Sequence, residues 1–356
     1  MPDIDPTKNF LGTGGRSFSS DVQDAKSEWA SAPEELSSPR SKESLFSSDQ
    51  ATIAHAPQTR TRALALAPDS ATKLSAYVAL TKPDVSFLVL MTTAAGFYMG
   101  VRGPMPWLHM IHVVFGTMLI AAGTAALNHY IERESDRYMR RTSSRPLPTG
   151  LLSPAEALRF GLALSLAGAI DLYFVAGYVA CLLGVFTSLS YLLAYTPLKK
   201  HTVWATFIGA VPGAIPPMIG WTAAAGKLDA GAWLLFAILF FWQFPHFHAI
   251  SWMYREDYAR AGILMLPVVD KDGSRTFRQI VFYAAGLIAV SLLPAVMGFA
   301  GVLYFFGALV TCTASLQVCL WAAYAKTNSR AKWLMHATVL HIPILLGLMM
   351  YDKLPR

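Results

Sequence analysis

The sequence N-H-Y-I-E-R-E-S-D-R-Y-M-R-R-T-S-S-R-P-L-P occupies residues 128–148 and directly follows an apolar run at residues 119–127. An apolar helix that ends in charged residues is typical of a membrane span that meets water. Asn128, Glu132 and Asp136 are spaced i, i+4 and i+8, so a helix that continues past the membrane surface places all three on one face. The stretch therefore predicts a transmembrane helix with a row of oxygen-bearing side chains at its end.

Several arginines surround this row: Arg133, Arg137, Arg140, Arg141 and Arg145. Mg²⁺ usually binds through one or two carboxylates plus substrate phosphates, and arginine holds phosphate oxygens by paired hydrogen bonds. The stretch thus suits a magnesium-bound diphosphate. The ordinary alternative is that the arginines only set membrane topology and the acids form a solvated helix end. The stretch alone leaves both interpretations open.

The composition identifies a membrane protein. Of 356 residues, 54% are hydrophobic and only 14% are charged, and the apolar residues occur in runs long enough to cross a bilayer. The formal charge of +7 does not indicate a nucleic-acid partner, because the basic residues lie in short loops between apolar runs. The partner that the composition implies is the lipid bilayer.

The chain after residue 82 predicts an all-α, polytopic membrane protein with about nine transmembrane helices. The expected spans are 84–101, 108–128, 154–173, 175–195, 203–223, 231–252, 279–299, 302–325 and 333–351. The fifth contains Pro212, Pro216 and Pro217, which should break the helix. A broken helix at membrane depth is expected to line a cavity.

Loop charge predicts the orientation of these spans. One set of loops carries most of the basic residues outside the tail: Arg133–Arg145, Lys199, Lys200, Arg255, Arg260, Lys271, Arg275, Arg278, Lys326, Arg330 and Lys332. The other side has only Arg102, Lys227, Lys353 and Arg356. The positive-inside rule places the first set in the cytoplasm or its equivalent, with the C-terminus outside.

Two segments are expected: a disordered tail at residues 1–72 and a membrane domain at residues 73–356. The tail is rich in Ser, Pro and acidic residues and has no apolar signal segment. Its acids argue against a mitochondrial transit peptide. We therefore favour the bacterial cytoplasmic (inner) membrane, with the mitochondrial inner membrane as the alternative.

A second acidic cluster follows the sixth span, where Arg255, Glu256 and Asp257 occur together. The second and sixth spans are four helices apart and point the same way, so both clusters face the same side of the membrane. This pattern indicates a duplicated four-helix unit with sites at the repeat interface. Two facing acid clusters can hold two Mg²⁺ ions across one diphosphate. Between them, Tyr195 and Lys199 offer a hydroxyl donor and a point charge at the end of the fourth span.

Six motifs carry a resemblance to a known family: N-x-x-x-E-x-x-x-D at 128–136, R-T-S-S-R-P-L-P-T-G at 141–150, Y-T-P-L-K-K at 195–200, G-A-V-P-G-A-I-P-P-M-I-G-W at 209–221, W-Q-F-P-H-F-H-A-I-S-W at 242–252 and R-E-D-Y-A-R-A-G-I-L-M-L-P at 255–267. They resemble the UbiA-type membrane prenyltransferases, and within them the branch that acts on heme. The resemblance covers about residues 75–350. Two positions depart from the family pattern: Asp84 stands where arginine is common, and Leu264 stands where proline is common.

The resemblance implies transfer of the farnesyl group of farnesyl diphosphate to a vinyl carbon of heme b, which gives heme O for terminal oxidases. Heme b is then a substrate and Mg²⁺ the cofactor, and heme A synthase or the oxidase assembly is an implied partner. The implied catalytic residues are Asn128, Glu132, Asp136, Glu256 and Asp257, of which Asn128, Glu132, Asp136 and Asp257 hold metal. The diphosphate set is Arg141, Arg145, Tyr195, Lys199 and Arg255, and His246 and His248 are candidates for orienting heme.

Two other functions compete with this one. A transporter also has intramembrane prolines, acids at helix ends and an internal repeat, but it more often places a charge in mid-span, where this chain is nearly free of charge. A UbiA-type enzyme that prenylates a quinone precursor has the same diphosphate chemistry. Only the heme-branch motifs argue against it.

Overall fold

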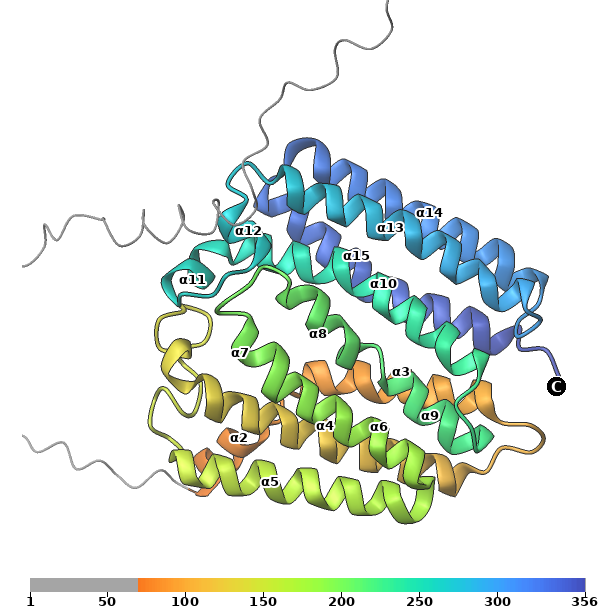
Figure 1. The fold of residues 1–356 in the computed structure, drawn as a ribbon, viewed down its shortest axis with the longest axis horizontal. Helices are drawn as coiled ribbons and strands as arrows, with labels where there is room; N and C mark the ends of the chain where they lie inside the picture. Colours follow the sequence, from red (N-terminus) through yellow and green to blue (C-terminus); the bar gives the residue numbers. More distant parts are fainter. Residues whose placement is uncertain (1–69, 356) are drawn as a thin grey trace, which may run out of the picture. The chain divides into compact units, whose positions relative to one another are not determined.

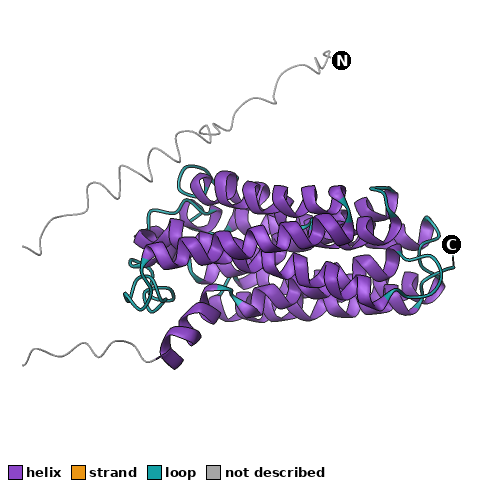
Figure 2. Cartoon of the chain, turned by 90° about the horizontal axis from the view of Figure 1, so that it is seen from below, coloured by secondary structure: helices purple, strands orange, loops and turns teal. Residues whose placement is uncertain are grey.

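The computed structural model describes residues 70–355, which are mostly helical (Figures 1 and 2). Within these residues the β-pairing is an isolated bridge between Ala300 and Lys353. The expected all-α class is confirmed. The tail is expected at residues 1–72, and residues 1–69 of it lie outside the described part of the chain. Helix α2 (Ser70–Leu80) begins at the first described residue.

Eight helical segments of residues 70–355 are long and apolar enough to cross a membrane, or nine if a bent pair counts as one span. The bent pair consists of α2 and α3 (Pro83–Gly100), which meet at 48°. Lys82 lies at the bend with a φ of 48°, in the left-handed region that a lysine rarely adopts. The expected count of about nine spans is therefore confirmed.

The second to fourth spans form α4 (Trp107–Asp136), α5 (Pro154–Asp171) with the π-helical turn η1 (Leu172–Ala176), and α6 (Tyr178–Leu189) with η2 (Ser190–Tyr195) and α7 (Thr196–Leu198). The boundary between the third and fourth spans is Gly177, which has a φ of 86°. A glycine adopts this angle without steric cost. The break therefore lies a few residues later than the break expected near residue 174.

The fifth span is broken as its prolines predict. It consists of α8 (Ala205–Gly213) and α9 (Pro216–Ala225), with Ala214 and Ile215 between them. Helix α9 is buried along nearly its whole length and packs against α3. Gly96 and Gly220 permit this contact, because a Cβ atom on either would lie 2.0 Å from a backbone carbonyl oxygen of the other helix.

The rest of the chain forms α10 (Ala230–Met253), the short helices α11 (Arg255–Arg260) and α12 (Leu266–Val269), and the last three spans α13 (Ser274–Val296), α14 (Val302–Ala325) and α15 (Asn328–Tyr351). Helix α10 packs against α13 and α15, and α14 covers both of these. In Figure 1, α4 to α6 form one side of the bundle, α10 and α13 to α15 form the other, and α3, α8 and α9 lie between them.

The two ends of the bundle differ in what they carry. The loop after α4 and the short helices α7, α11 and α12 lie at one end, and the C-terminus lies at the other (Figure 1). The loops with most of the basic residues thus share one end with both acidic clusters. This is the arrangement that the loop charges and the duplicated unit predict.

Candidate active site

The row of side chains at the end of α4 is buried in the bundle. Asn128, Glu132 and Asp136 are 1%, 6% and 0% exposed. Helix α4 has 30 residues, a length of about 45 Å at 1.5 Å per residue, so it extends beyond a hydrocarbon core about 30 Å thick. The three side chains share one face, as their spacing predicts, and this face points into the bundle rather than into water.

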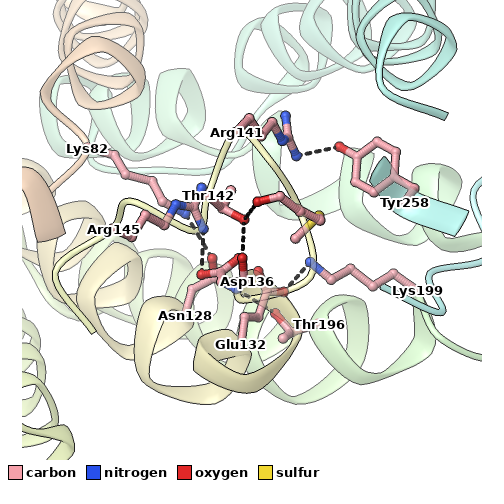
Figure 3. A network of polar contacts seen from close by, with 11 residues as sticks. Lys82, Asn128, Glu132, Asp136, Arg141, Thr142, Arg145, Thr196, Lys199 and Tyr258 are labelled. Atoms are coloured by element: carbon pink, nitrogen blue, oxygen red, sulfur yellow. Dashed lines mark hydrogen bonds and ion pairs between the residues drawn. The ribbon is translucent and has the colours of Figure 1, made fainter. Parts of the chain in front are cut away.

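Each member of the row contacts a cation from a different segment (Figure 3). Asn128 Oδ1 accepts a hydrogen bond from Lys82 Nζ at 2.8 Å, and Glu132 forms an ion pair with Lys199. Asp136 Oδ2 accepts a hydrogen bond from Arg145 Nη1 at 2.8 Å. Two carboxylates and an amide oxygen therefore face three cations in a buried space. Charges this close and this poorly solvated interact more strongly than charges in water.

Lys82 is a site residue that the sequence analysis did not predict. Its left-handed backbone at the start of α3 accompanies a side chain that reaches Asn128 on α4, 46 residues away. Asp84, the position that departs from the family pattern, is exposed. In the sequence, the signal for this role is a lysine that precedes a proline at the start of a predicted span, on the side of the membrane that carries the acidic clusters. Such a residue is usually a membrane anchor, so the signal was weak.

Asp136 has the features expected of a metal ligand. Its Oδ1 is buried and has no hydrogen-bond partner among the described residues, whereas Oδ2 binds Arg145. An unpaired buried carboxylate oxygen is costly unless something binds it. Thr142 Oγ1 donates to the backbone carbonyl oxygen of Asp136 at 2.9 Å, which ties the following loop to the helix end.

The amide of Asn128 is oriented from its other side by Thr196. Asn128 Nδ2 donates to Thr196 Oγ1 at 3.3 Å, and that hydroxyl donates to Tyr191 O at 2.8 Å. Thr196 follows the π-helical turn η2, a type of distortion often found at functional sites. This contact leaves the amide oxygen of Asn128 directed at Lys82 and the site.

The two remaining members of the diphosphate set near α4 are Arg141 and Tyr195. Arg141 Nη2 donates to the hydroxyl of Tyr258 at 2.7 Å. Tyr195 is partly buried, with the ammonium of Lys199 lying 5.8 Å from its ring centroid. Its ring also packs against Gly209, where a Cβ atom would come within 2.6 Å of Tyr195 Cδ2. Both residues lie where α4 and its loop meet later segments.

The residues of the second acidic cluster differ from one another in burial and in the partners they contact. Asp257 is 8% exposed and forms an ion pair with Arg260, whereas Glu256 is exposed. Arg255 donates to Asn328 Oδ1 at 2.7 Å and lies over the ring of Trp252, so it contacts the start of α15. Within residues 70–355, no hydrogen bond or ion pair joins Arg255, Glu256 or Asp257 directly to the row on α4. The structure brings the two clusters to one end, where Tyr258 of α11 accepts a hydrogen bond from Arg141 in the loop after α4.

The two candidate heme histidines contact neighbouring helices. His246 Nδ1 hydrogen-bonds Thr338 Oγ1 at 2.9 Å, and its ring stacks on Trp242 with centroids 4.9 Å apart. His248 is 1% exposed, and its Nε2 hydrogen-bonds Gln279 Oε1 at 2.9 Å. In this arrangement both side chains join helices of the second half.

The geometry suits one kind of chemistry. Hard oxygen atoms and three cations, buried at the end of a membrane bundle, can hold a divalent cation and a phosphorylated amphiphile. Residues 70–355 contain no group of three or more His, Cys, Asp or Glu side chains able to hold a metal by themselves. A magnesium ion there would need phosphate oxygens to complete its coordination, as is usual for this ion.

Comparison with known proteins agrees with this geometry. The family model described as "UbiA prenyltransferase family" matches residues 89–342. The chain is 49% identical to the protoheme IX farnesyltransferase of Solibacter usitatus over 78% of its own length and 98% of the relative's. It is also similar to a solved digeranylgeranylglyceryl phosphate synthase, with 19% identity, a TM-score of 0.66 and coverage of 79% and 98% of the two chains.

A second solved structure has ligands of the expected kind. A UbiA homolog from Archaeoglobus fulgidus bound to GPP and Mg²⁺ is 14% identical, with a TM-score of 0.54 and coverage of 77% of this chain and 99% of that chain. At these identities the structural matches support the fold alone. The family model and the sequence relative support more than the fold, because they show that this chain belongs to the UbiA prenyltransferase family.

Proposed function

We propose that this protein transfers the farnesyl group of farnesyl diphosphate to the vinyl group of heme b and so produces heme O. The observation that supports it most directly is the buried row of Asn128, Glu132 and Asp136, which faces three cations at one end of the bundle. The heme acceptor is supported by the 49% identity to a protoheme IX farnesyltransferase over nearly all of that relative.

The basic side chains are assigned to the diphosphate. Lys82, Arg145 and Lys199 each approach an oxygen of the row, and Arg141 lies on the loop that connects α4 to α5. Before substrate binds, Arg145 and Lys199 are paired with the two carboxylates of the row, and Lys82 is bonded to its neutral amide. A diphosphate bound with a divalent cation allows them to rearrange, with the metal at the acids and the basic groups at the phosphate oxygens.

The residues present fit Mg²⁺, on the strength of the orphaned Oδ1 of Asp136 and the all-oxygen donor set. Asn128, Glu132 and Asp136 would hold it, with Asp257 as a candidate for a second ion. When bound, Mg²⁺ would supply positive charge at the diphosphate while the bond between the diphosphate and the farnesyl group weakens. The site's own cations act in the same direction, since they neutralise the leaving group.

The reaction breaks the farnesyl C1–O bond, the π bond of the vinyl group and an O–H bond of water, and it forms one C–C bond and one C–O bond. The bond between C1 of the farnesyl group and the diphosphate oxygen breaks, and the electron pair leaves with the diphosphate. The terminal vinyl carbon of heme then bonds to C1, and the adjacent carbon takes a hydroxyl from water, with release of a proton. Aromatic faces of α10 are candidates for shielding the allylic cation: Phe240, Phe241, Trp242, Phe244, Phe247 and Trp252.

The membrane and its sidedness belong to the same proposal. The chain is an integral multi-pass membrane protein, and we assign its active site to the cytoplasmic face of a bacterial inner membrane from the basic loops at that end. Heme A synthase or the assembling terminal oxidase is the expected consumer of the product.

One assay tests the function. Purified protein in detergent, supplied with heme b, farnesyl diphosphate and Mg²⁺, should convert heme into a heavier, more apolar species detected by mass spectrometry. The control omits farnesyl diphosphate. Prenylation of 4-hydroxybenzoate with heme left unchanged would instead assign the protein to the quinone branch. Proteoliposomes that move a solute without prenylating any acceptor would support a transporter.

A further inference from the structure

We propose that Tyr258 is a positioning residue that orients Arg141 toward the diphosphate, so that the second half of the chain sets the direction of a cation from the first half. This inference rests on the proposed function, because it takes Arg141 as part of the diphosphate site. It adds to that function a contact between α11 and the loop after α4. The two residues are 117 positions apart in the sequence.

The contact holds the guanidinium from two sides. Arg141 Nη2 donates to the Tyr258 hydroxyl at 2.7 Å (Figure 3), and the guanidinium carbon lies 5.0 Å from the Tyr258 ring centroid. The ring of Tyr254 lies at 4.8 Å from the same carbon. Stacking on aromatic faces and a directed hydrogen bond together restrict an otherwise flexible side chain.

Among the described residues, the side-chain hydrogen bond of Arg141 goes to a phenol rather than to a carboxylate. Lys199 and Arg145 are paired with Glu132 and Asp136. The partner of Arg141 is a phenol, a group that is neutral near pH 7. A neutral acceptor orients the guanidinium without cancelling its charge. The full positive charge and the remaining N–H donors stay available for an anion.

Tyr258 is itself held firmly. It is 7% exposed and lies in an apolar cluster with Met139, Ile263 and Met265. Met139 belongs to the same loop as Arg141, so both the apolar and the polar parts of Tyr258 contact that loop. Asp257, next to Tyr258, pairs with Arg260, whose Nε donates to Tyr138 O at 3.4 Å. The segment therefore contacts the loop at several points.

The turn after α11 also reaches a second cation of the site. Gly262, with a φ of 65°, lets the chain reverse direction, and Leu264 N donates to the backbone carbonyl of Lys199 at 2.8 Å. A proline, the residue common at this position in the resembling family, has no N–H and could not make this bond. In this chain, Tyr258 and Leu264 thus connect one short segment to both Arg141 and Lys199.

The test is a double-mutant cycle read out by binding of farnesyl diphosphate. Tyr258→Phe removes only the hydroxyl and keeps the ring. In detergent, with Mg²⁺ and without heme, calorimetry should show roughly tenfold weaker binding of farnesyl diphosphate, the size expected for one lost hydrogen bond to a charged group. Inhibition of turnover by inorganic diphosphate should weaken in parallel, while KM for heme stays unchanged.

In an Arg141→Lys background, Tyr258→Phe should have little further effect, because the bond is already lost. Tyr138→Phe, in the same loop with a side chain that is 65% exposed, is the matched control and should bind farnesyl diphosphate as the wild type does. Wild-type affinity in Tyr258→Phe, or an equal loss in both backgrounds, would overturn the proposal. Failure of the wild type to prenylate heme would refute the proposed function instead, and the binding cycle would still decide the role of Tyr258.

Discussion

Asp136→Asn separates a metal and phosphate site from a merely buried helix end. The substitution nearly preserves side-chain volume and removes the charge that a hard cation requires. Asp136 is 0% exposed, with one oxygen bound to Arg145 at 2.8 Å and the other without a partner among the described residues. Loss of one preorganised electrostatic group at a reacting centre lowers kcat by about 100- to 1000-fold. We expect a loss in that range.

The cost to folding should be smaller than the cost to catalysis. Breaking a fully buried ion pair costs about 3–5 kcal/mol. The side chain of Arg145 is 24% exposed and can find water, so we expect about 1–2 kcal/mol of destabilisation. The variant should therefore insert, purify and show a cooperative thermal transition at a slightly lower temperature.

The assay compares kcat for heme prenylation across a Mg²⁺ titration in wild type, Asp136→Asn and Glu134→Gln. Glu134 is the matched control, since it lies on the same helix end with a side chain that is 63% exposed, and its partners among the described residues are Arg133 and Arg137. Surface pairs contribute little, so Glu134→Gln should keep nearly full activity. An Asp136→Asn enzyme with more than half of the wild-type kcat and an unchanged Mg²⁺ requirement would refute the assignment of Asp136.

Three further outcomes are expected. Lys82→Ala should raise KM for farnesyl diphosphate roughly tenfold or more, as for a lost charge-assisted contact, while KM for heme stays constant; an unchanged KM would remove Lys82 from the site. Gly220→Ala places a Cβ atom 2.0 Å from Thr93 O and should destabilise the bundle by about 1–3 kcal/mol in thermal melts, whereas Gly347→Ala, with open space around it, should not; equal melting temperatures would contradict the close packing of α3 on α9. In a cysteine-free background, single cysteines at Lys200 and Lys332 should label only from the cytoplasmic side and one at Lys227 only from outside, and the opposite pattern would invert the orientation.

The sequence by itself determined much of the architecture. Apolar run length gave the spans, because an apolar segment of sufficient length is enough to cross a bilayer. Pro212, Pro216 and Pro217 predicted the break in the fifth span, because proline removes a helix hydrogen bond wherever it occurs. The spacing of Asn128, Glu132 and Asp136 gave their common face, because helix periodicity is a local property. The motifs predicted the family that the comparisons show.

Tertiary structure alone decided which cation meets which oxygen. Lys82 reaches Asn128 across 46 residues, and Tyr258 reaches Arg141 across 117. No local period encodes such contacts, since they depend on how α3, α4 and α11 pack. The same packing separated exposed Glu256 from buried Asp257 and turned Arg255 toward Asn328. The sequence does not distinguish the surroundings of these three neighbouring residues. Their surroundings differ because of how the short helix α11 packs on the rest of the bundle.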